Sequence, residues 1–209
     1  MTSLQKKRKE IREAIHNAAI QEFARNGLAG TSTQAIAQTA GITKAQLHYY
    51  ISSKEELYQQ VLSDIVRQWK DIFFLSAWRD DPALSITRYI ERKVQHSLEY
   101  PDISRLFANE IARGAPEMDQ HWPTLTAAVG EANAVIQEWI DSGKIAPVDP
   151  LLFQMNMWAV TQHYAEYEAQ VRVLMGKPAP ELLDTDRIVA EAIQLFLRRC
   201  GLDSEMETQ

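Results

Sequence analysis

Apolar residues recur at intervals of three and four along nearly the whole chain, and this periodicity restricts the fold more than any other feature of the sequence. Leu57, Val61, Ile65, Trp69 and Phe73, for example, follow one another at intervals of four. Such spacing places side chains on one face of an α-helix, whereas a half-buried strand alternates at every second residue. We find no such alternation, no internal repeat and no low-complexity segment. The sequence therefore predicts an all-α fold.

Helix-capping and helix-breaking residues divide the chain into nine expected helices. Asn26-Gly27 follows the first helix, Gly41 the second, and Tyr100-Pro101 separates the fifth from the sixth. Ser, Thr and Asp side chains can accept hydrogen bonds from the free N–H groups of a first turn, where proline is also favoured. The expected helices cover about residues 8–25, 34–40, 44–50, 54–76, 82–99, 101–113, 123–142, 150–175 and 184–199.

Residues 34–50 combine a short helix, a tight turn and a second short helix. Gly41 in the turn suits a backbone position with positive φ. The apolar residues Ile36, Ala37 and Leu47 can pack the two helices together. This arrangement is typical of a helix-turn-helix, whose second helix enters the major groove of DNA. A helical hairpin inside a bundle has the same pattern, so these residues alone leave both interpretations open.

The second short helix and its surroundings carry side chains that suit contacts with DNA. Lys44 can donate to guanine and Gln46 can pair with adenine, and such contacts read base edges. Other hydroxyl and amino groups suit the phosphate backbone, where contacts position a protein without reading the sequence. The expected DNA-binding residues are Thr31, Thr33, Thr43, Lys44, Ala45, Gln46, His48, Tyr49 and Lys54.

The charges are distributed unevenly along the chain. The formal net charge is −6, yet residues 1–54 hold eight Lys and Arg against three acidic residues, so the remainder carries −11. A basic segment on an acidic body favours a nucleic-acid partner at one end. A basic tail that only promotes solubility gives the same balance, so charge alone does not decide between the two.

A longer string around the helix-turn-helix, residues 10–62, contains a specific set of residues. They are Phe23, Gly27, Thr31, Ile36-Ala37, Ala40-Gly41-Ile42, Leu47, Tyr49-Tyr50 and Lys54-Glu55-Glu56-Leu57. This set resembles the DNA-binding domain of the TetR family of transcriptional regulators, apart from Ile51, where the family usually has Phe. The resemblance implies a nine-helix, all-α repressor.

The resemblance also implies a division into two domains. Residues 1–53 would form a three-helix DNA-binding domain that contains the helix-turn-helix. Residues 54–209 would form a helical domain that binds a ligand and forms a homodimer through the last two helices, which correspond here to 150–175 and 184–199. The expected helix at 54–76 would connect the two domains.

Two stretches of the C-terminal part, 97–116 and 139–171, resemble one subgroup of the family, whose members regulate pyrimidine utilisation. Members of this subgroup hold a pyrimidine base between aromatic side chains, and polar groups reach its amide edges. Indole rings stack on flat heterocycles, and a Gln amide offers both a donor and an acceptor. The expected ligand-binding residues are Trp69, Phe73, Asn109, Arg113, Trp158, Thr161 and Gln162.

Alternatives remain for several of these residues. Trp69 and Trp158 lie on apolar helical faces, where packing in the core is the other interpretation. Gln162 is expected near the dimer interface and could bond across it. Asn109 could face the ligand or water. Arg113 departs from the subgroup, which is more apolar there, so it could either admit an anionic ligand or face solvent.

Several classes of function have no support in the sequence. The single cysteine, Cys200, cannot form an internal disulfide, and no apolar run approaches the ~20 residues of a membrane span. The basic N-terminal residues lead into no apolar signal segment, so we expect a cytoplasmic protein with no membrane partner. The five histidines are scattered, and we find no phosphate loop or nucleophile motif. We therefore expect no metal, no cofactor and no enzymatic activity.

The expected function is that of a ligand-responsive, DNA-binding transcriptional regulator. The resemblance implies a homodimeric repressor that a small molecule, such as uracil or a related heterocycle, releases from palindromic double-stranded operator DNA. The alternative is a small-molecule-binding or interaction protein that uses the same fold without binding operator DNA. Salt-dependent DNA binding distinguishes the two, because phosphate contacts release counterions.

Overall fold

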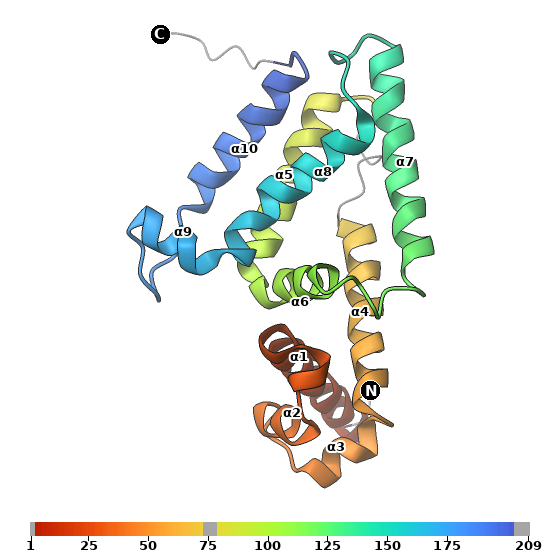
Figure 1. Cartoon of the computed structure of the whole chain (residues 1–209), viewed down its shortest axis with the longest axis vertical. Helices are drawn as coiled ribbons and strands as arrows, with labels where there is room; N and C mark the ends of the chain where they lie inside the picture. The colour runs from red at the N-terminus through yellow and green to blue at the C-terminus, as the bar shows by residue number, and fades with distance from the viewer. Residues whose placement is uncertain (1–2, 73–78, 203–209) are drawn as a thin grey trace. The chain divides into compact units, whose positions relative to one another are not determined.

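The computed structural model of the chain describes residues 3–72 and 79–202, and within these ranges it is helical without strands (Figure 1). This confirms the all-α prediction. The helices are α1 (Ser3–Gly30), α2 (Thr33–Thr39), α3 (Lys44–Tyr50), α4 (Lys54–Ile72), α5 (Pro82–Glu99), α6 (Pro101–Ala112), α7 (Trp122–Asp141), α8 (Pro150–Glu166), α9 (Glu168–Met175) and α10 (Thr185–Arg199).

The described residues contain ten helices where nine were expected, because the segment expected as one helix over 150–175 is divided. Tyr167 separates α8 from α9 with φ −110° and ψ 32°, which lies outside the helical region. Neither Gly nor Pro occurs at this point, so the sequence carries no signal for the break. The last four residues expected in the fourth helix, 73–76, lie outside the described residues.

Most other helix ends follow the expected capping chemistry. Asp81 and Asp149 each accept a hydrogen bond from the backbone N–H three residues later, and Pro82 and Pro150 occupy the first turns of α5 and α8. These bonds satisfy N–H groups that have no partner within the helix. Ser53 caps α4 in the same way, because its hydroxyl accepts from the backbone N–H of Glu56.

Two glycines of the N-terminal region adopt the left-handed conformation. Gly27 has φ 65° and ψ 176°, so the regular helix stops there, close to the expected end, although the helical assignment continues through Gly30. A β-carbon on Gly27 would also lie 3.3 Å from Nη1 of Arg113. Gly41 has φ 68° in the turn between α2 and α3, as its position predicted.

The chain forms two compact units, which we describe separately. The N-terminal unit comprises the described residues of Met1–Arg67 and Asp102–Trp122, and the C-terminal unit those of Gln68–Pro101 and Pro123–Gln209. α6 therefore belongs to the same unit as α1, α2 and α3, and α4 passes from one unit to the other. The compact units are divided after Arg67, Pro101 and Trp122, and not between residues 53 and 54. The expected boundary between a DNA-binding and a ligand-binding domain stays a prediction.

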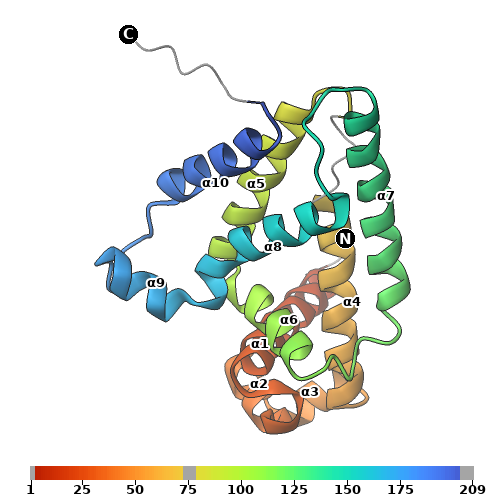
Figure 2. The same cartoon turned by 45° about the horizontal axis from the view of Figure 1, so that its top comes forward.

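The N-terminal unit is held together by apolar side chains from α1 to α4. α2 packs against both α1 and α3 (Figure 2). The rings of Phe23 and Tyr58 meet edge to face, with centroids 4.8 Å apart. Each fully buried Val, Leu, Ile or Phe side chain contributes about 1.5–3 kcal/mol through removal from water. The core includes Ile15, Ala19, Phe23, Ile36, Ala37, Leu47, Val61, Leu62 and Ile65.

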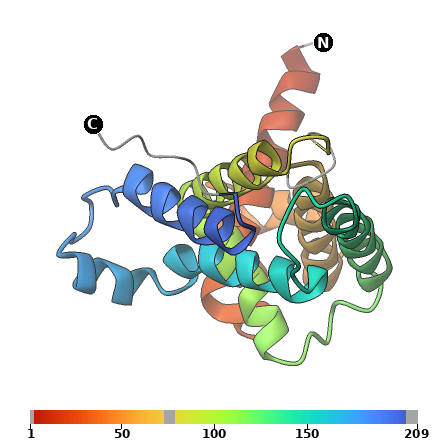
Figure 3. The same ribbon diagram turned by 90° about the horizontal axis from the view of Figure 1, so that it is seen from above.

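In the C-terminal unit α5 packs against both α8 and α10 (Figure 3). The core includes Ile86, Ile90, Val94, Ile136, Trp139, Phe153, Met157, Ile188 and Phe196. The indole N–H of Trp139 donates to the backbone oxygen of Arg79 at 2.6 Å. Cys200 is buried at the end of α10, and burial raises the pKa of its thiol to about 11, so the thiol is unreactive near neutral pH.

Among the helices that the structure describes, none is both long and apolar enough to cross a membrane. The same residues contain no group of three or more His, Cys, Asp or Glu side chains placed to hold a metal ion.

Candidate DNA-binding surface and ligand site

The helix-turn-helix is fixed by a buried core and by a capping box. Ile36, Ala37 and Leu47 are fully buried between its helices. At the start of α3, the Thr43 hydroxyl accepts from the backbone N–H of Gln46 at 3.1 Å, and Gln46 Oε1 accepts from the backbone N–H of Thr43 at 2.9 Å. Two N–H groups are thereby satisfied, and the first turn of α3 is held in place.

The outer surface of α3 is polar and open to solvent. The residues expected there, all of them exposed, are Thr43, Lys44, Ala45, Gln46, His48 and Tyr49. The Tyr49 side chain is 71% exposed and meets the Tyr50 ring edge to face. Because the capping box uses Gln46 Oε1, Gln46 can pair with adenine through both of its amide atoms only if that capping bond opens.

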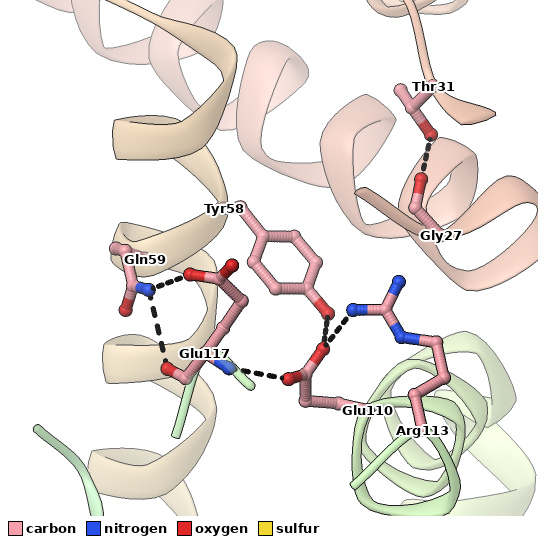
Figure 4. Close-up of polar contacts among 7 residues, drawn as sticks. All are labelled: Gly27, Thr31, Tyr58, Gln59, Glu110, Arg113 and Glu117. Atoms are coloured by element: carbon pink, nitrogen blue, oxygen red, sulfur yellow. Dashed lines mark hydrogen bonds and ion pairs between the residues drawn. The ribbon is translucent and has the colours of Figure 1, made fainter. Parts of the chain in front are cut away.

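The remaining expected DNA contacts lie at the junction of α1, α2 and α4. Thr31 is buried, and its hydroxyl donates to the backbone oxygen of Gly27 at 2.8 Å (Figure 4). The same hydroxyl also donates to the backbone oxygen of Glu22 at 3.0 Å. Lys54 is half-buried and donates through Nζ to the backbone oxygen of Thr31 at 2.9 Å. Thr33 is half-buried in the first turn of α2. In this structure Thr31 and Lys54 therefore bond within the N-terminal unit, and their contacts with DNA stay predictions.

Hydrogen bonds of a buried carboxylate attach α6 to other parts of the N-terminal unit. This carboxylate belongs to Glu110, which is 1% exposed. Figure 4 shows Glu110 accepting from the Tyr58 hydroxyl at 2.7 Å, from the backbone N–H of Glu117 at 2.8 Å and from Arg113 at 2.9 Å. Burial and the Glu110 carboxylate both raise the pKa of Tyr58. A carboxylate with three donors is well compensated for its burial.

Asn109 and Arg113, which were expected to bind ligand, also form bonds in the N-terminal unit. Asn109 Nδ2 donates to the backbone oxygen of Ala24 at 3.1 Å. Arg113 pairs with Glu110, and its side chain is 40% exposed. These two residues belong to the N-terminal unit, whereas the other expected ligand-binding residues that the structure describes belong to the C-terminal unit. Their assignment to the ligand site stays a prediction, and Phe73 lies outside the described residues.

A polar cluster lies inside the C-terminal unit, centred on Lys93 of α5. Its members, which we call the Lys93 cluster, are Trp69, Lys93, His96, Gln162 and Glu166. Lys93 is 4% exposed, and its Nζ lies 4.0 Å from the centroid of the Trp69 ring. Burial lowers the pKa of Lys93 to about 7, and the negative charge of Glu166 acts in the opposite direction.

Burial and the charges of neighbouring groups also shift the pKa values of Glu166 and His96. Gln162 donates through Nε2 to Glu166 Oε1 at 3.3 Å. Burial raises the pKa of Glu166, while the charges of Lys93 and His163 oppose this effect. Burial lowers the pKa of His96, and the positive charge of Lys93 lowers it further. The cluster therefore offers one cation, one anion and neutral donors within an apolar unit.

Trp158 and Thr161 of α8 bond to their own surroundings. The Trp158 indole forms a side-chain hydrogen bond with Tyr89, whose pKa burial raises. Thr161 is fully buried and donates to the backbone oxygen of Met157 at 2.7 Å. Ser97 of α5 donates to the backbone oxygen of Thr161 at 2.9 Å. Both residues lie in the same unit as the Lys93 cluster, and their contacts with a ligand stay predictions.

The sequence predictions missed Lys93, His96 and Glu166. A signal for Lys93 exists, because the buried face of α5 carries it between apolar residues at helical spacing. A cation at such a position is rarely buried without a partner or a function. The buried residues of α5 include Ile86, Tyr89, Ile90, Lys93, Val94 and Ser97.

The C-terminal unit also has a surface cavity of about 450 Å³, and the two basic side chains that line it, Arg79 and Lys144, already have partners. Arg79 pairs with Glu138, and Lys144 donates to the backbone oxygen of Asp80 at 3.0 Å. None of the expected ligand-binding residues that the structure describes lines this cavity. The lining residues are Arg79, Asp80, Glu138, Trp139, Asp141, Ser142 and Lys144.

Comparisons with known proteins agree with this architecture. Residues 15–61 match the family model of bacterial regulatory proteins of the tetR family, and residues 62–203 match that of the C-terminal region of YcdC-like proteins. The chain is 42% identical over 168 residues to the HTH-type transcriptional regulator RutR of Escherichia coli K12, covering 79% of this chain and 78% of RutR.

Two further relatives come from Streptomyces coelicolor. The HTH-type transcriptional repressor SCO4008 is 30% identical over 158 residues, which cover 70% of this chain and 76% of that protein. The crystal structure of the transcriptional regulator SCO4942 superimposes with a TM-score of 0.72 at 23% identity, covering 92% of this chain and 99% of that chain. This last similarity shows the fold alone.

Proposed function

Because the chain belongs to the TetR family of bacterial regulatory proteins, we propose that it acts as a ligand-responsive, DNA-binding transcriptional regulator. It represses transcription from palindromic operator DNA and is released by a small molecule bound in the C-terminal unit. It is not an enzyme, in agreement with the relatives, which are named as transcriptional regulators.

The exposed polar surface of α3 is the observation that carries this proposal. Thr43 and Gln46 hold the first turn of α3, and Leu47 anchors the helix in the core, so the remaining side chains project from a fixed support. Lys44 reads base edges in the major groove, and Gln46 does so once its capping bond opens, while Tyr49 contacts the phosphate backbone. The basic first turns of α1, which are exposed, add attraction to phosphates.

The protein acts as a homodimer through the segments 150–175 and 184–199, which the structure divides into α8, α9 and α10. Large apolar side chains that are exposed on these segments support this assignment, because dimerisation would cover them. Leu152, Met155 and Tyr167 are exposed on or next to α8, and Leu195 on α10. To read a palindrome, the dimer must present its two α3 helices about one turn of B-DNA apart, ~34–36 Å.

The effector binds at Trp69, Trp158 and Gln162, and α4 connects this site to the helix-turn-helix. The first part of α4, with Lys54, belongs to the N-terminal unit, and Trp69 belongs to the C-terminal unit. A ligand shifts the equilibrium between DNA-binding and released states only through its different affinities for them, typically by about 1–3 kcal/mol. The resemblance to pyrimidine-utilisation regulators supports a heterocycle of the pyrimidine class.

Fluorescence anisotropy with the DNA upstream of the protein's own gene tests this function. Binding is measured at two salt concentrations, with and without uracil or thymine. Binding that weakens with salt and is lost with a pyrimidine supports both parts of the proposal. Binding that ignores pyrimidines rejects that effector class and retains the regulator. Absence of binding both to this DNA and to a pool of random sequences contradicts DNA recognition.

A further inference from the structure

We propose that the effector of the C-terminal unit is a planar heterocycle that carries a carboxylate, and that this carboxylate pairs with the ammonium group of Lys93. The inference rests on the proposed function, because it assigns the chemical class of the molecule that the regulator senses. It concerns a residue that the sequence predictions did not include.

The first argument is the position of Lys93 in the core. Its side chain is as buried as those of its apolar neighbours on α5, and Ile90 and Val94 are fully covered on either side of it. Burial of an ammonium group costs several kcal/mol unless a charge or a set of acceptors compensates it. Groups that bear such a cost cluster at functional sites.

The second argument is that the ammonium group occupies a face of Trp69. Nζ lies 4.0 Å from the ring centroid, which is within the range of a cation–π contact. A flat ring that stacks on this face of Trp69 must displace the ammonium group. A neutral ring would leave the displaced ammonium in an apolar unit without a new anion. A ring that carries a carboxylate supplies that anion, so the geometry favours the charged ligand.

The third argument concerns Glu166, the carboxylate of the chain whose charge interacts with Lys93. Glu166 of α8 is the group whose negative charge favours the ammonium form. Glu166 is itself partly desolvated, which raises its pKa, and its Oε1 accepts from Gln162. The positive charges of Lys93 and His163 favour its ionised form. An effector carboxylate would therefore compete with Glu166 for Lys93, while the Gln162 amide could turn to the ring.

In the sequence analysis, Arg113 was the candidate cation for an anionic ligand, with exposure to solvent as the alternative. The structure places Arg113 in the N-terminal unit, where it pairs with the buried Glu110 carboxylate. Lys93 lies instead in the same unit as Trp69, Trp158 and Gln162. Lys93 therefore supplies a buried cation in the same unit as the aromatic residues, and the assignment of Arg113 to the ligand site stays a prediction.

Calorimetric titration of the full-length protein with matched ligand pairs tests the proposal. The two members of each pair share a ring, and only one of them carries a carboxylate: uracil and its 6-carboxylate orotate, and nicotinamide and nicotinate. We expect at least one carboxylate to bind about tenfold or more tightly than its neutral partner, as a charge-assisted hydrogen bond provides. Lys93→Met should remove this preference, since methionine keeps the length of the side chain without its charge.

Two further variants separate a charge effect from a structural one. Glu166→Gln should increase the preference for the carboxylate, because it removes the competing acid. Lys177→Met removes an ammonium group from the surface of the same unit, where Lys177 pairs with Glu181, and should change nothing. A packing defect would not move the preference in opposite directions in Lys93→Met and Glu166→Gln.

The proposal is overturned if the neutral member of each pair binds as tightly as the carboxylate, if no carboxylate binds, or if Lys93→Met keeps the preference. DNA binding of the same proteins, measured by anisotropy without ligand, distinguishes this failure from failure of the proposed function. Intact DNA binding together with failed carboxylate binding rejects only the effector class.

Discussion

Replacement of Lys93 by methionine is expected to stabilise the protein by an amount that depends on pH. Burial lowers the pKa of Lys93 from 10.5 to about 7. Below pH ~7 the folded and unfolded chains both carry the ammonium group, so the folded chain bears the full cost of burying it. Above pH ~10.5 both are neutral, and the cost is zero. The difference between the two pKa values, at about 1.4 kcal/mol per unit, corresponds to about 3–5 kcal/mol.

Between these limits the unfolded chain binds more protons than the folded one, so this contribution to the free energy of unfolding rises with pH. Urea unfolding of the wild type and of Lys93→Met, followed by circular dichroism from about pH 6 to pH 10, gives the difference between them. The protein concentration is held constant, because dissociation of a dimer contributes to the measured stability. The variant should be more stable below pH ~7, and its advantage should shrink as the pH rises.

Lys177→Met is the control for this experiment, because it removes an exposed ammonium group and should give a difference that does not change with pH. The pKa of Glu166 is raised from 4.5, so any destabilisation that its burial causes grows as the pH rises from 4.5 through its folded pKa. Lys93→Met removes a charge that lowers the pKa of Glu166, so this destabilisation extends to higher pH in the variant and adds to the decline of its advantage. The reasoning is refuted if Lys93→Met is less stable than the wild type below pH ~7, or if the difference is the same at every pH.

Three further substitutions test the N-terminal unit. Leu47→Ala removes a fully buried side chain from α3 and should lower the free energy of unfolding by about 2–5 kcal/mol and weaken DNA binding, as urea unfolding and anisotropy would show. Lys44→Ala should leave stability unchanged and weaken specific DNA binding by about 1–3 kcal/mol in anisotropy titrations; unchanged affinity would contradict its place on the DNA-facing surface. Tyr58→Phe removes one hydrogen-bond donor from the buried Glu110 and should lower the free energy of unfolding, measured with urea, by about 1–3 kcal/mol. Tyr49→Phe, at an exposed position, is the control and should have little effect.

The sequence predicts most helix ends because the chemistry of a helix end is local. Asp81 with Pro82 and Asp149 with Pro150 cap and begin α5 and α8 through contacts that span three residues. The break at Tyr167 could not be predicted in this way, since no helix-breaking residue marks it. His163 and Tyr167 stack on each other there, with ring centroids 4.9 Å apart.

The two candidate sites differ in how well the sequence predicts them. The surface of α3 depends on one buried residue, Leu47, and on one cap, so short-range spacing is sufficient to predict which side chains are exposed. The ligand site depends on contacts between helices that lie far apart in the chain. Periodicity shows that Lys93 and Glu166 belong to helices, but it does not show that their charges act on each other. For the same reason the contact of Arg113 with the N-terminal unit was not predicted.

Hydroxyl-radical footprinting of the upstream DNA tests the central claim most directly. A dimer that presents two α3 helices should protect two segments related by a palindrome, with centres about one helical turn apart. The double variant Lys44→Ala/Gln46→Ala should lose both protected segments while its circular dichroism stays unchanged. A single protected segment, or protection that survives in the double variant, would contradict the claim that paired α3 helices read operator DNA.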